Sequence, residues 1–163
     1  MTLELTTRDV NRLRRILLDL LDQSEADGCL VCDQAGHVLA YENVNRQDPL
    51  LISALGAGVY AATRELARLL GEDEFSCVLH QGVKRSILIG AASEDILLVV
   101  LFSGDTRVGL VKLYTPTAAA AIRAVLEEAG ARRNAPGGRR VAFELSDRGE
   151  IFGGTRDGAQ GAE

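Results

Sequence analysis

Residues 49–62 read PLLISALGAGVYAA, an apolar helical stretch whose middle is crowded with glycine and alanine. Asp48 precedes it, and aspartate before proline is a strong helix start. The carboxylate accepts free amide protons, and the fixed φ of proline suits the first helical position. The sequence therefore predicts a helix that begins at Pro49, runs to Leu70 and is stopped by Gly71.

Glycine inside a helix lowers its stability by about 1 kcal/mol relative to alanine. A structural or functional reason must therefore account for Gly56 and Gly58. We expect close approach by another backbone, across a flat surface that a second helix or a protein partner could cover. That surface comprises small residues along one side, Ala54, Ala57, Gly58, Ala61 and Ala62. Alternatively, these residues only let the helix cross its own sheet. The bulkier residues are expected to face the sheet, namely Leu51, Ile52, Leu55, Val59, Leu66 and Leu69.

Two further elements are predicted before this helix. Thr6 and Asp9 have the spacing of a capping box, and the apolar residues that follow recur at helical spacing up to about Ser24. Residues 29–33 and 37–41 flank the turn Gln34-Ala35-Gly36 and are typical of a tight hairpin.

Three strands are predicted after the helix, over 75–81, 86–91 and 96–102, and their short connections make them antiparallel. Residues 109–114 fit either a helix or a strand, with Pro116 nearby. An alanine-rich helix follows from Thr117 and should end near Gly130.

The last part of the chain changes character, so we expect a domain over 1–130 and a flexible tail over 131–163. Residues 141–152 form an apolar and acidic motif in this tail. Such a motif either folds back on its own domain or binds a partner, and both possibilities stay open. Its apolar residues are Phe143, Leu145, Ile151 and Phe152.

Composition excludes some functions. A chain of 163 residues with 47% hydrophobic residues suits one domain with its own core. A net charge of −5 argues against binding the phosphates of nucleic acid, and 4% aromatic residues leave few surfaces for base stacking.

No run approaches the roughly 20 apolar residues that span a bilayer. The acidic Glu4 and Asp9 are not typical of a signal peptide, and three cysteines form no disulfide framework. We expect a cytoplasmic protein.

Candidate chemistry is sparse. Cys29 and Cys32 have CxxC spacing, but residues three apart on a strand point to opposite faces, so packing is favoured over redox or zinc chemistry. His37 and His80 have no partners at catalytic or metal-site spacing. Because no glycine-rich phosphate loop is present, we expect no direct nucleotide binding. No paired acid and base or nucleophile and base is visible, so we expect no catalytic site, and we also expect no metal and no cofactor.

Four further segments have specific sequences: LARLLGEDEF at 66–75, HQG at 80–82, LLVVLF at 97–102 and GLVKL at 109–113. They closely resemble the bacterial MglB proteins of the roadblock / dynein light chain family, and the resemblance covers about 8–129. The tail run FELSD at 143–147, followed by Ile151-Phe152, is similar to the C-terminal motif of the family. Gly149 makes it a poorer helix than the acidic version in the family.

The resemblance implies an α+β sandwich of order α-β-β-α-β-β-β-α around a five-stranded antiparallel sheet. It also implies a homodimer in which two sheets join edge to edge and the second helices pair. Such a dimer would bind a small Ras-like GTPase of the MglA type in cell polarity or gliding motility. It would stimulate GTP hydrolysis or nucleotide exchange. The alternative is a scaffold or adaptor dimer without effect on turnover.

In the family, small residues on the second helix let the GTPase approach, and these places match Ala61 and Glu65. Glu65 departs from the pattern, which leaves the identity of the partner open. The family has no arginine finger, but Arg64 could share the helical face of Ala57 and act in trans. Arg64, Glu65 and Arg68 complete the predicted partner-binding set.

Overall fold

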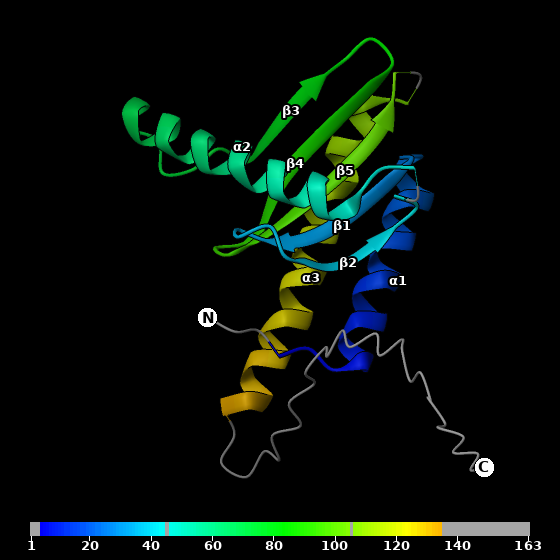
Figure 1. Cartoon of the computed structure of the whole chain (residues 1–163), viewed down its shortest axis with the longest axis vertical. Helices are drawn as coiled ribbons and strands as arrows, with labels where there is room; N and C mark the ends of the chain where they lie inside the picture. Colours follow the sequence, from blue (N-terminus) through cyan, green and yellow to red (C-terminus); the bar gives the residue numbers. More distant parts are fainter. Residues whose placement is uncertain (1–3, 45, 105, 135–163) are drawn as a thin grey trace, which may run out of the picture.

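The computed structural model describes residues 4–44, 46–104 and 106–134. It contains three helices and five strands (Figure 1). In chain order they are α1 (Thr7–Ser24), β1 (Gly28–Asp33), β2 (Val38–Glu42), α2 (Pro49–Leu70), β3 (Cys77–Gln81), β4 (Arg85–Ser93), β5 (Ile96–Ser103) and α3 (Val108–Asn134). The predicted order and fold class are confirmed.

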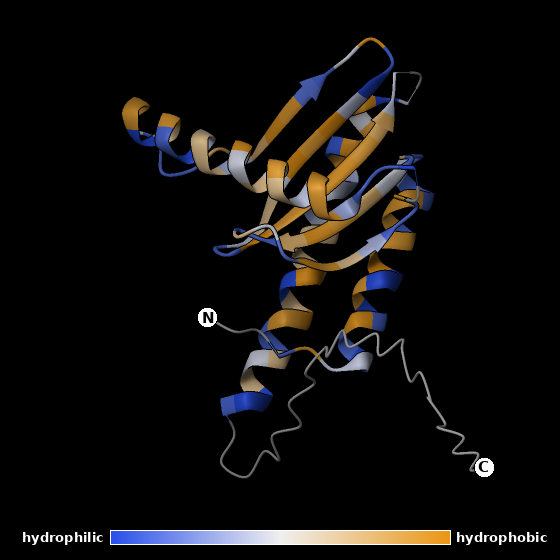
Figure 2. Cartoon of the chain, in the orientation of Figure 1, coloured by the Kyte–Doolittle hydropathy of each residue, from blue (hydrophilic) through white to orange (hydrophobic). Residues whose placement is uncertain are grey.

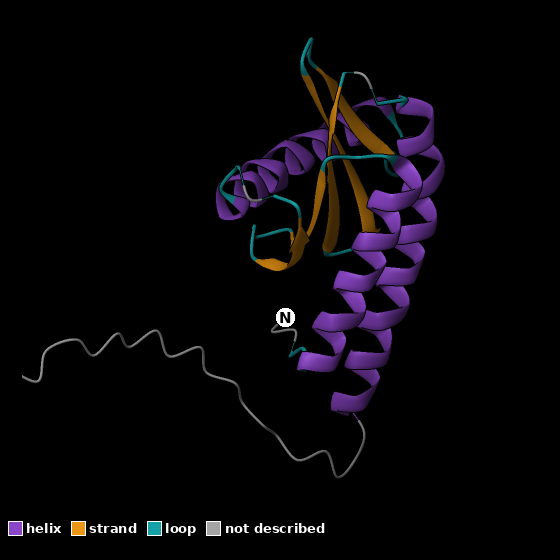
Figure 3. Ribbon diagram, turned by 90° about the vertical axis from the view of Figure 1, so that its right-hand side faces the viewer, coloured by secondary structure: helices purple, strands orange, loops and turns teal. Residues whose placement is uncertain are grey.

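The strands form one antiparallel sheet in the order β2-β1-β5-β4-β3, which leaves β2 and β3 at the edges. Helices α1 and α3 lie together on one face, and α2 crosses the other face (Figure 3). The chain is thus a three-layer sandwich with the sheet in the middle.

Local sequence signals set the starts of α1 and α2. The Thr6 hydroxyl accepts a hydrogen bond from the amide of Asp9, and the Asp9 carboxylate accepts one from the amide of Thr6 at 2.9 Å. Asp48 accepts from the amides of Leu50 and Leu51. Gly71 ends α2 in the left-handed conformation, at φ 74°. The predicted caps are confirmed because each depends only on residues close in sequence.

The two faces of the sheet bury separate cores, since successive residues of a strand point to opposite faces. Leu98 and Val100 of β5 pack with α1 and α3. Leu97 and Val99 of the same strand pack with α2, beside Tyr60.

Two ion pairs join the antiparallel helices α1 and α3. Arg12 lies 2.5 Å from Glu128, and Arg132 lies 2.6 Å from the fully buried carboxylate of Asp9. The C-terminal end of α3 is therefore held against the first turn of α1.

The structure settles the ambiguous segment 109–114 as helix. Val111, Thr115, Ala118 and Ile122 recur three or four residues apart on the buried side of α3, whereas Pro116 lies on the exposed side. The predicted end near Gly130 was wrong, because α3 continues to Asn134.

No helix within the described ranges is long and apolar enough to cross a membrane. The predicted tail motif lies outside the described residues, together with its apolar members Phe143, Leu145, Ile151 and Phe152.

Candidate partner-binding surface on helix α2

The side of α2 that faces the sheet is lined by small residues and one tyrosine. Its buried residues are Ser53, Gly56, Ala57, Tyr60 and Ala67. A Cβ on Gly56 would lie 3.6 Å from Val99 and 3.8 Å from Ile89, which is ordinary contact distance. At Gly56 the branched side chains of the sheet already fill the space under α2, so a methyl group fits there but a larger side chain does not.

The prediction that the bulky residues of α2 face the sheet was largely wrong. Ile52 and Val59 are half-buried against the sheet, as expected. Leu51, Leu55 and Leu66 are each more than half exposed, and Leu69 is 81% exposed. The alternative that small residues let the helix cross its own sheet therefore holds for Gly56 and Ala57.

An apolar stripe runs along the opposite side of α2 (Figure 2). Its members are spaced three or four residues apart, as on one side of a helix. We name as the outer α2 face the exposed residues Leu51, Leu55, Gly58, Ala62, Leu66 and Leu69.

The predicted small residues divide between the two sides of the helix. Ala54, Gly58, Ala61 and Ala62 are exposed, and a Cβ on Gly58 would meet nothing within 4 Å. Ala57 is only 6% exposed and packs on the sheet, so the surface does not include it. Intramolecular packing explains Gly56 but not Gly58.

The predicted charged residues occupy different positions. Arg64 lies on the same side of α2 as Ala57 and donates a hydrogen bond to the side-chain oxygen of Gln34 at 3.0 Å. Glu65 and Arg68 are exposed and form an ion pair of 2.6 Å. Arg64 is thus held against the β1–β2 turn, whereas the pair of Glu65 and Arg68 lies beside the apolar stripe.

The β1–β2 turn fixes the N-terminal half of α2. The Ser53 hydroxyl donates to the carbonyl of Gly36 at 2.6 Å. Asp33 accepts from the amides of Ala35 and His37 and from the His37 ring. Burial acts to raise the pKa of Asp33, but the hydrogen bonds from His37 outweigh it, so its pKa lies below the ordinary value.

The C-terminal half of α2 projects past the edge strand β3 (Figure 1). Tyr60 donates a hydrogen bond to Glu74 in the connection to β3. Burial and then this carboxylate raise the pKa of Tyr60. Because β3 pairs only with β4 among the described strands, an open backbone edge lies beside the projecting leucines.

The remaining candidate residues do not form a site. Cys29 packs with α1 and α3 and Cys32 packs with α2, so the thiols lie on opposite faces as predicted. Burial raises the pKa of each to about 12. In the described part of the chain no group of three metal-binding side chains occurs, and the His37 ring lies 2.8 Å from the carboxylate of Asp33.

Sequence comparison agrees with this geometry. The chain matches the model of the Roadblock/LC7 domain over residues 13–102 and belongs to the roadblock family. Within that family it is similar to MglB proteins, as its sequence runs predicted.

Three solved MglB structures document this similarity. An MglB with a tetrameric arrangement is 32% identical, with a TM-score of 0.73, and the match covers 78% of this chain and 97% of that one. The gliding protein MglB of Thermus thermophilus is 32% identical, with a TM-score of 0.72 and the same coverage. The Myxococcus xanthus MglB is 26% identical, with a TM-score of 0.72 over 78% of this chain and 96% of that one.

The sequence analysis does not identify the leucines of the outer α2 face as surface residues. Their spacing of three and four residues predicts one side of a helix, but that side faces away from the sheet. The helix itself carries no signal that separates the two sides, because apolar residues recur at helical spacing on both.

Proposed function

We propose that this protein is a homodimeric regulator of a small Ras-like GTPase, which it stimulates to hydrolyse GTP or to exchange nucleotide. The observation that carries the proposal is the outer α2 face, an exposed apolar stripe in a chain similar to MglB proteins. Soluble proteins rarely leave such a stripe uncovered unless a partner binds there.

The projecting half of α2 and the edge of β3 suit a second copy of the chain. Leu66 and Leu69 extend beyond the sheet, next to the unpaired edge of β3. Two copies related by a twofold axis would pair these edges and cover the leucines of both helices in one step. We therefore assign the dimer contact to this half of the helix.

The flatter part of α2 suits the GTPase. Ala54, Gly58, Ala61 and Ala62 are exposed and present almost no side chain, so a partner backbone can come close. The ion pair of Glu65 and Arg68 borders this part and supplies polar contacts that would favour one partner over another. Cell polarity or gliding motility is the process that the resemblance to MglB proteins supports.

The protein would act through its partner and supply no catalytic group of its own. Arg64 is the arginine that could have entered the active site of the GTPase in trans. It already donates a hydrogen bond to Gln34 of its own chain. This contact is equally compatible with the second candidate function, a scaffold or adaptor dimer that binds a GTPase without changing its turnover.

The test combines the purified protein with a small Ras-like GTPase from the same organism. We expect a complex by size-exclusion chromatography and faster release of phosphate or of labelled nucleotide. A complex with unchanged rates would select the scaffold function, and the lack of a complex would exclude both.

A matched pair of variants locates the contact. Ala61→Arg places a long cation on the flat part of α2 and should abolish the complex. Ala120→Arg makes the same change at an exposed alanine of α3 and should leave the complex intact. Equal binding by both variants would show that the GTPase binds elsewhere.

A further inference from the structure

The edge strand β2 has an open side that no other strand of the described chain covers. β2 pairs with β1 alone, so the backbone groups on its far side are free for another strand. Proteins usually cover or blunt such edges, because an open edge pairs readily with any extended chain. A strand of matching pattern can add there through main-chain hydrogen bonds.

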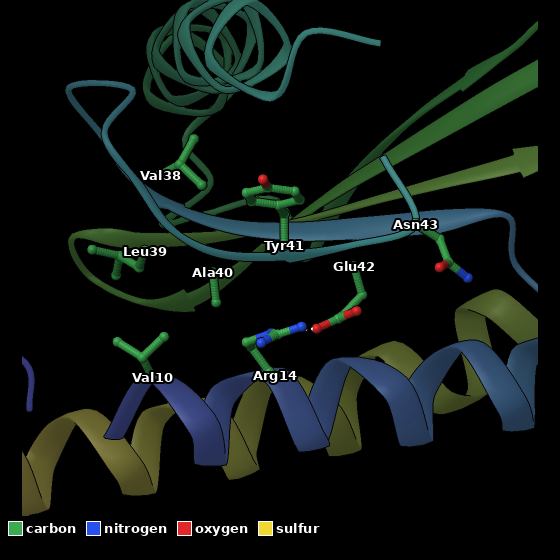
Figure 4. A pocket seen from close by; sticks show the side chains of 8 residues that line it. All are labelled: Val10, Arg14, Val38, Leu39, Ala40, Tyr41, Glu42 and Asn43. Carbon is green, nitrogen blue, oxygen red and sulfur yellow. Dashed lines mark hydrogen bonds and ion pairs between the residues drawn. The ribbon is translucent and has the colours of Figure 1, made fainter. Parts of the chain in front are cut away.

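A groove of about 600 Å³ runs along this edge between β2 and α1 (Figure 4). Ala40 and Glu42 point toward α1, and Tyr41 points to the other side. At one end of the groove Val10 faces the strand. At the other end Arg14 lies 2.5 Å from Glu42, so the groove changes from apolar to polar along its length.

Helices α1 and α3 both extend past the β2 edge of the sheet (Figure 3). The helices therefore offer support for one more strand beyond β2. The half-buried Val10 lines the groove opposite β2 and would be covered by apolar side chains of an added strand.

The chain itself leaves the domain at the apolar end of this groove. Arg132 binds Asp9, the neighbour of Val10, and α3 ends two residues later at Asn134. Residues 135–140 can span up to roughly 20 Å when extended. Because Arg132 contacts Asp9, this connection starts close to the end of the groove that Val10 lines.

The sequence after this connection has the pattern of a strand. In residues 141–145, VAFEL, the apolar Val141, Phe143 and Leu145 alternate with Ala142 and Glu144. This run has the same length as β2, which has five residues.

The change from apolar to polar residues along 141–147 also matches the change along the groove. A chain that enters at Val10 and runs parallel to β2 places its apolar residues first and Asp147 last, beside the half-exposed Arg14. Arg14 donates to Glu42 through Nε and is half exposed, so its terminal N–H groups can bind the carboxylate of Asp147 as well.

We propose that residues 141–145 of the same chain add to β2 as a sixth, parallel strand, with Val141, Phe143 and Leu145 against α1. This site lies on the other face of the sheet from α2. The proposal does not depend on the identity of the GTPase or on its binding.

Hydrogen exchange of the full-length protein tests the strand. We expect slow exchange both at residues 141–145 and along β2. Phe143→Asp puts a charge into the groove and should raise exchange in both segments by about tenfold or more. Phe152→Asp makes the same change outside the added strand and should leave both segments slow. Unprotected residues 141–145 in the unsubstituted protein, or no response of β2 to Phe143→Asp, would overturn the proposal.

Photo-cross-linking identifies the chain that supplies the strand. Benzoylphenylalanine in place of Phe143 keeps an aromatic side chain, and irradiation of the full-length protein should join it to α1 or β2 within one chain. The product would run as a monomer on a denaturing gel. A cross-link between two chains, or to another part of the molecule, would contradict the assignment to the same chain.

Discussion

One terminal nitrogen of Arg132 lies 2.6 Å from each carboxylate oxygen of Asp9, which is buried at the start of α1. The same carboxylate receives the amide and hydroxyl protons of Thr6. One side chain therefore both caps α1 and fixes the end of α3. Burial acts to raise the pKa of Asp9, but the hydrogen bonds from Thr6 and Arg132 outweigh it and hold the pKa below its ordinary value.

This arrangement predicts acid sensitivity. A native pKa below the unfolded value stabilises the fold fully above an unfolded pKa of about 3.9. The stabilisation is lost as the pH falls through the native pKa. Asp9→Asn should lower the free energy of unfolding at pH 7 by about 2 kcal/mol. It should also flatten the pH dependence of that free energy below about pH 4. Urea denaturation at several pH values measures both effects.

Asp19→Asn provides the control, since Asp19 is exposed on the same helix. It should leave the free energy of unfolding at pH 7 nearly unchanged. Parallel curves for Asp9→Asn and the unsubstituted protein would show that the buried carboxylate does not titrate as described.

Gly36→Ala should destabilise the fold strongly. Gly36 has φ +88°, and a Cβ there would lie 2.8 Å from the Cα of Ala54. The left-handed backbone and the collision with α2 together should lower the free energy of unfolding by about 3 kcal/mol. Gly109→Ala is the control, because a Cβ at Gly109 meets nothing within 4 Å. It should stabilise slightly. Equal stabilities would mean that the β1–β2 turn moves freely away from α2.

Leu69→Asp should separate the proposed dimer without unfolding the protomer. Leu69 is 81% exposed, so the protomer loses little when it is replaced, whereas a charge in an apolar contact between two helices opposes association. Analytical ultracentrifugation should give half the mass, with an unchanged circular dichroism spectrum. Val83→Asp changes a residue that is 98% exposed at the β3–β4 turn and should stay dimeric. If Leu69→Asp stayed dimeric like Val83→Asp, the dimer interface would not include this part of α2.

Arg64→Ala separates an arginine finger from a structural role. An arginine that enters the GTPase site contributes about 10³ to 10⁵ in rate. Because Arg64 donates to Gln34, we expect its replacement to change phosphate release by less than about tenfold. Gln34→Ala removes the acceptor of the same bond and should have a similar effect. If the rate of phosphate release fell about a thousandfold in Arg64→Ala but not in Gln34→Ala, Arg64 would act as an arginine finger.

Local signals made much of the fold predictable. The capping residues Thr6 and Asp48 act on amides two or three positions away, so sequence alone locates the helix starts. Alternation also placed Cys29 and Cys32 on opposite faces correctly, because this property of a strand needs no knowledge of its neighbours.

The orientation of α2 could not be predicted in the same way. Apolar residues occur on both sides of this helix, so its own periodicity does not distinguish the sheet side from the outer side. Ile89 and Val99 decide the matter at Gly56, since they fill the space beneath it and leave room for no more than a methyl group. In the sequence, Ile89 and Val99 lie about thirty and about forty positions after Gly56. The ambiguity over residues 109–114 had the same origin, because the buried contacts of Val111 come from distant elements.

Strand β5 has consequences for how this chain can change in length. Its adjacent residues Leu98 and Val99 pack into different cores, on opposite faces of the sheet. The same alternation continues along the strand. Inserting or deleting one codon within β5 would exchange the two sets of side chains and ruin both layers together. Tolerated length variation in homologous genes should therefore fall in connections such as the exposed Gly82–Lys84 turn.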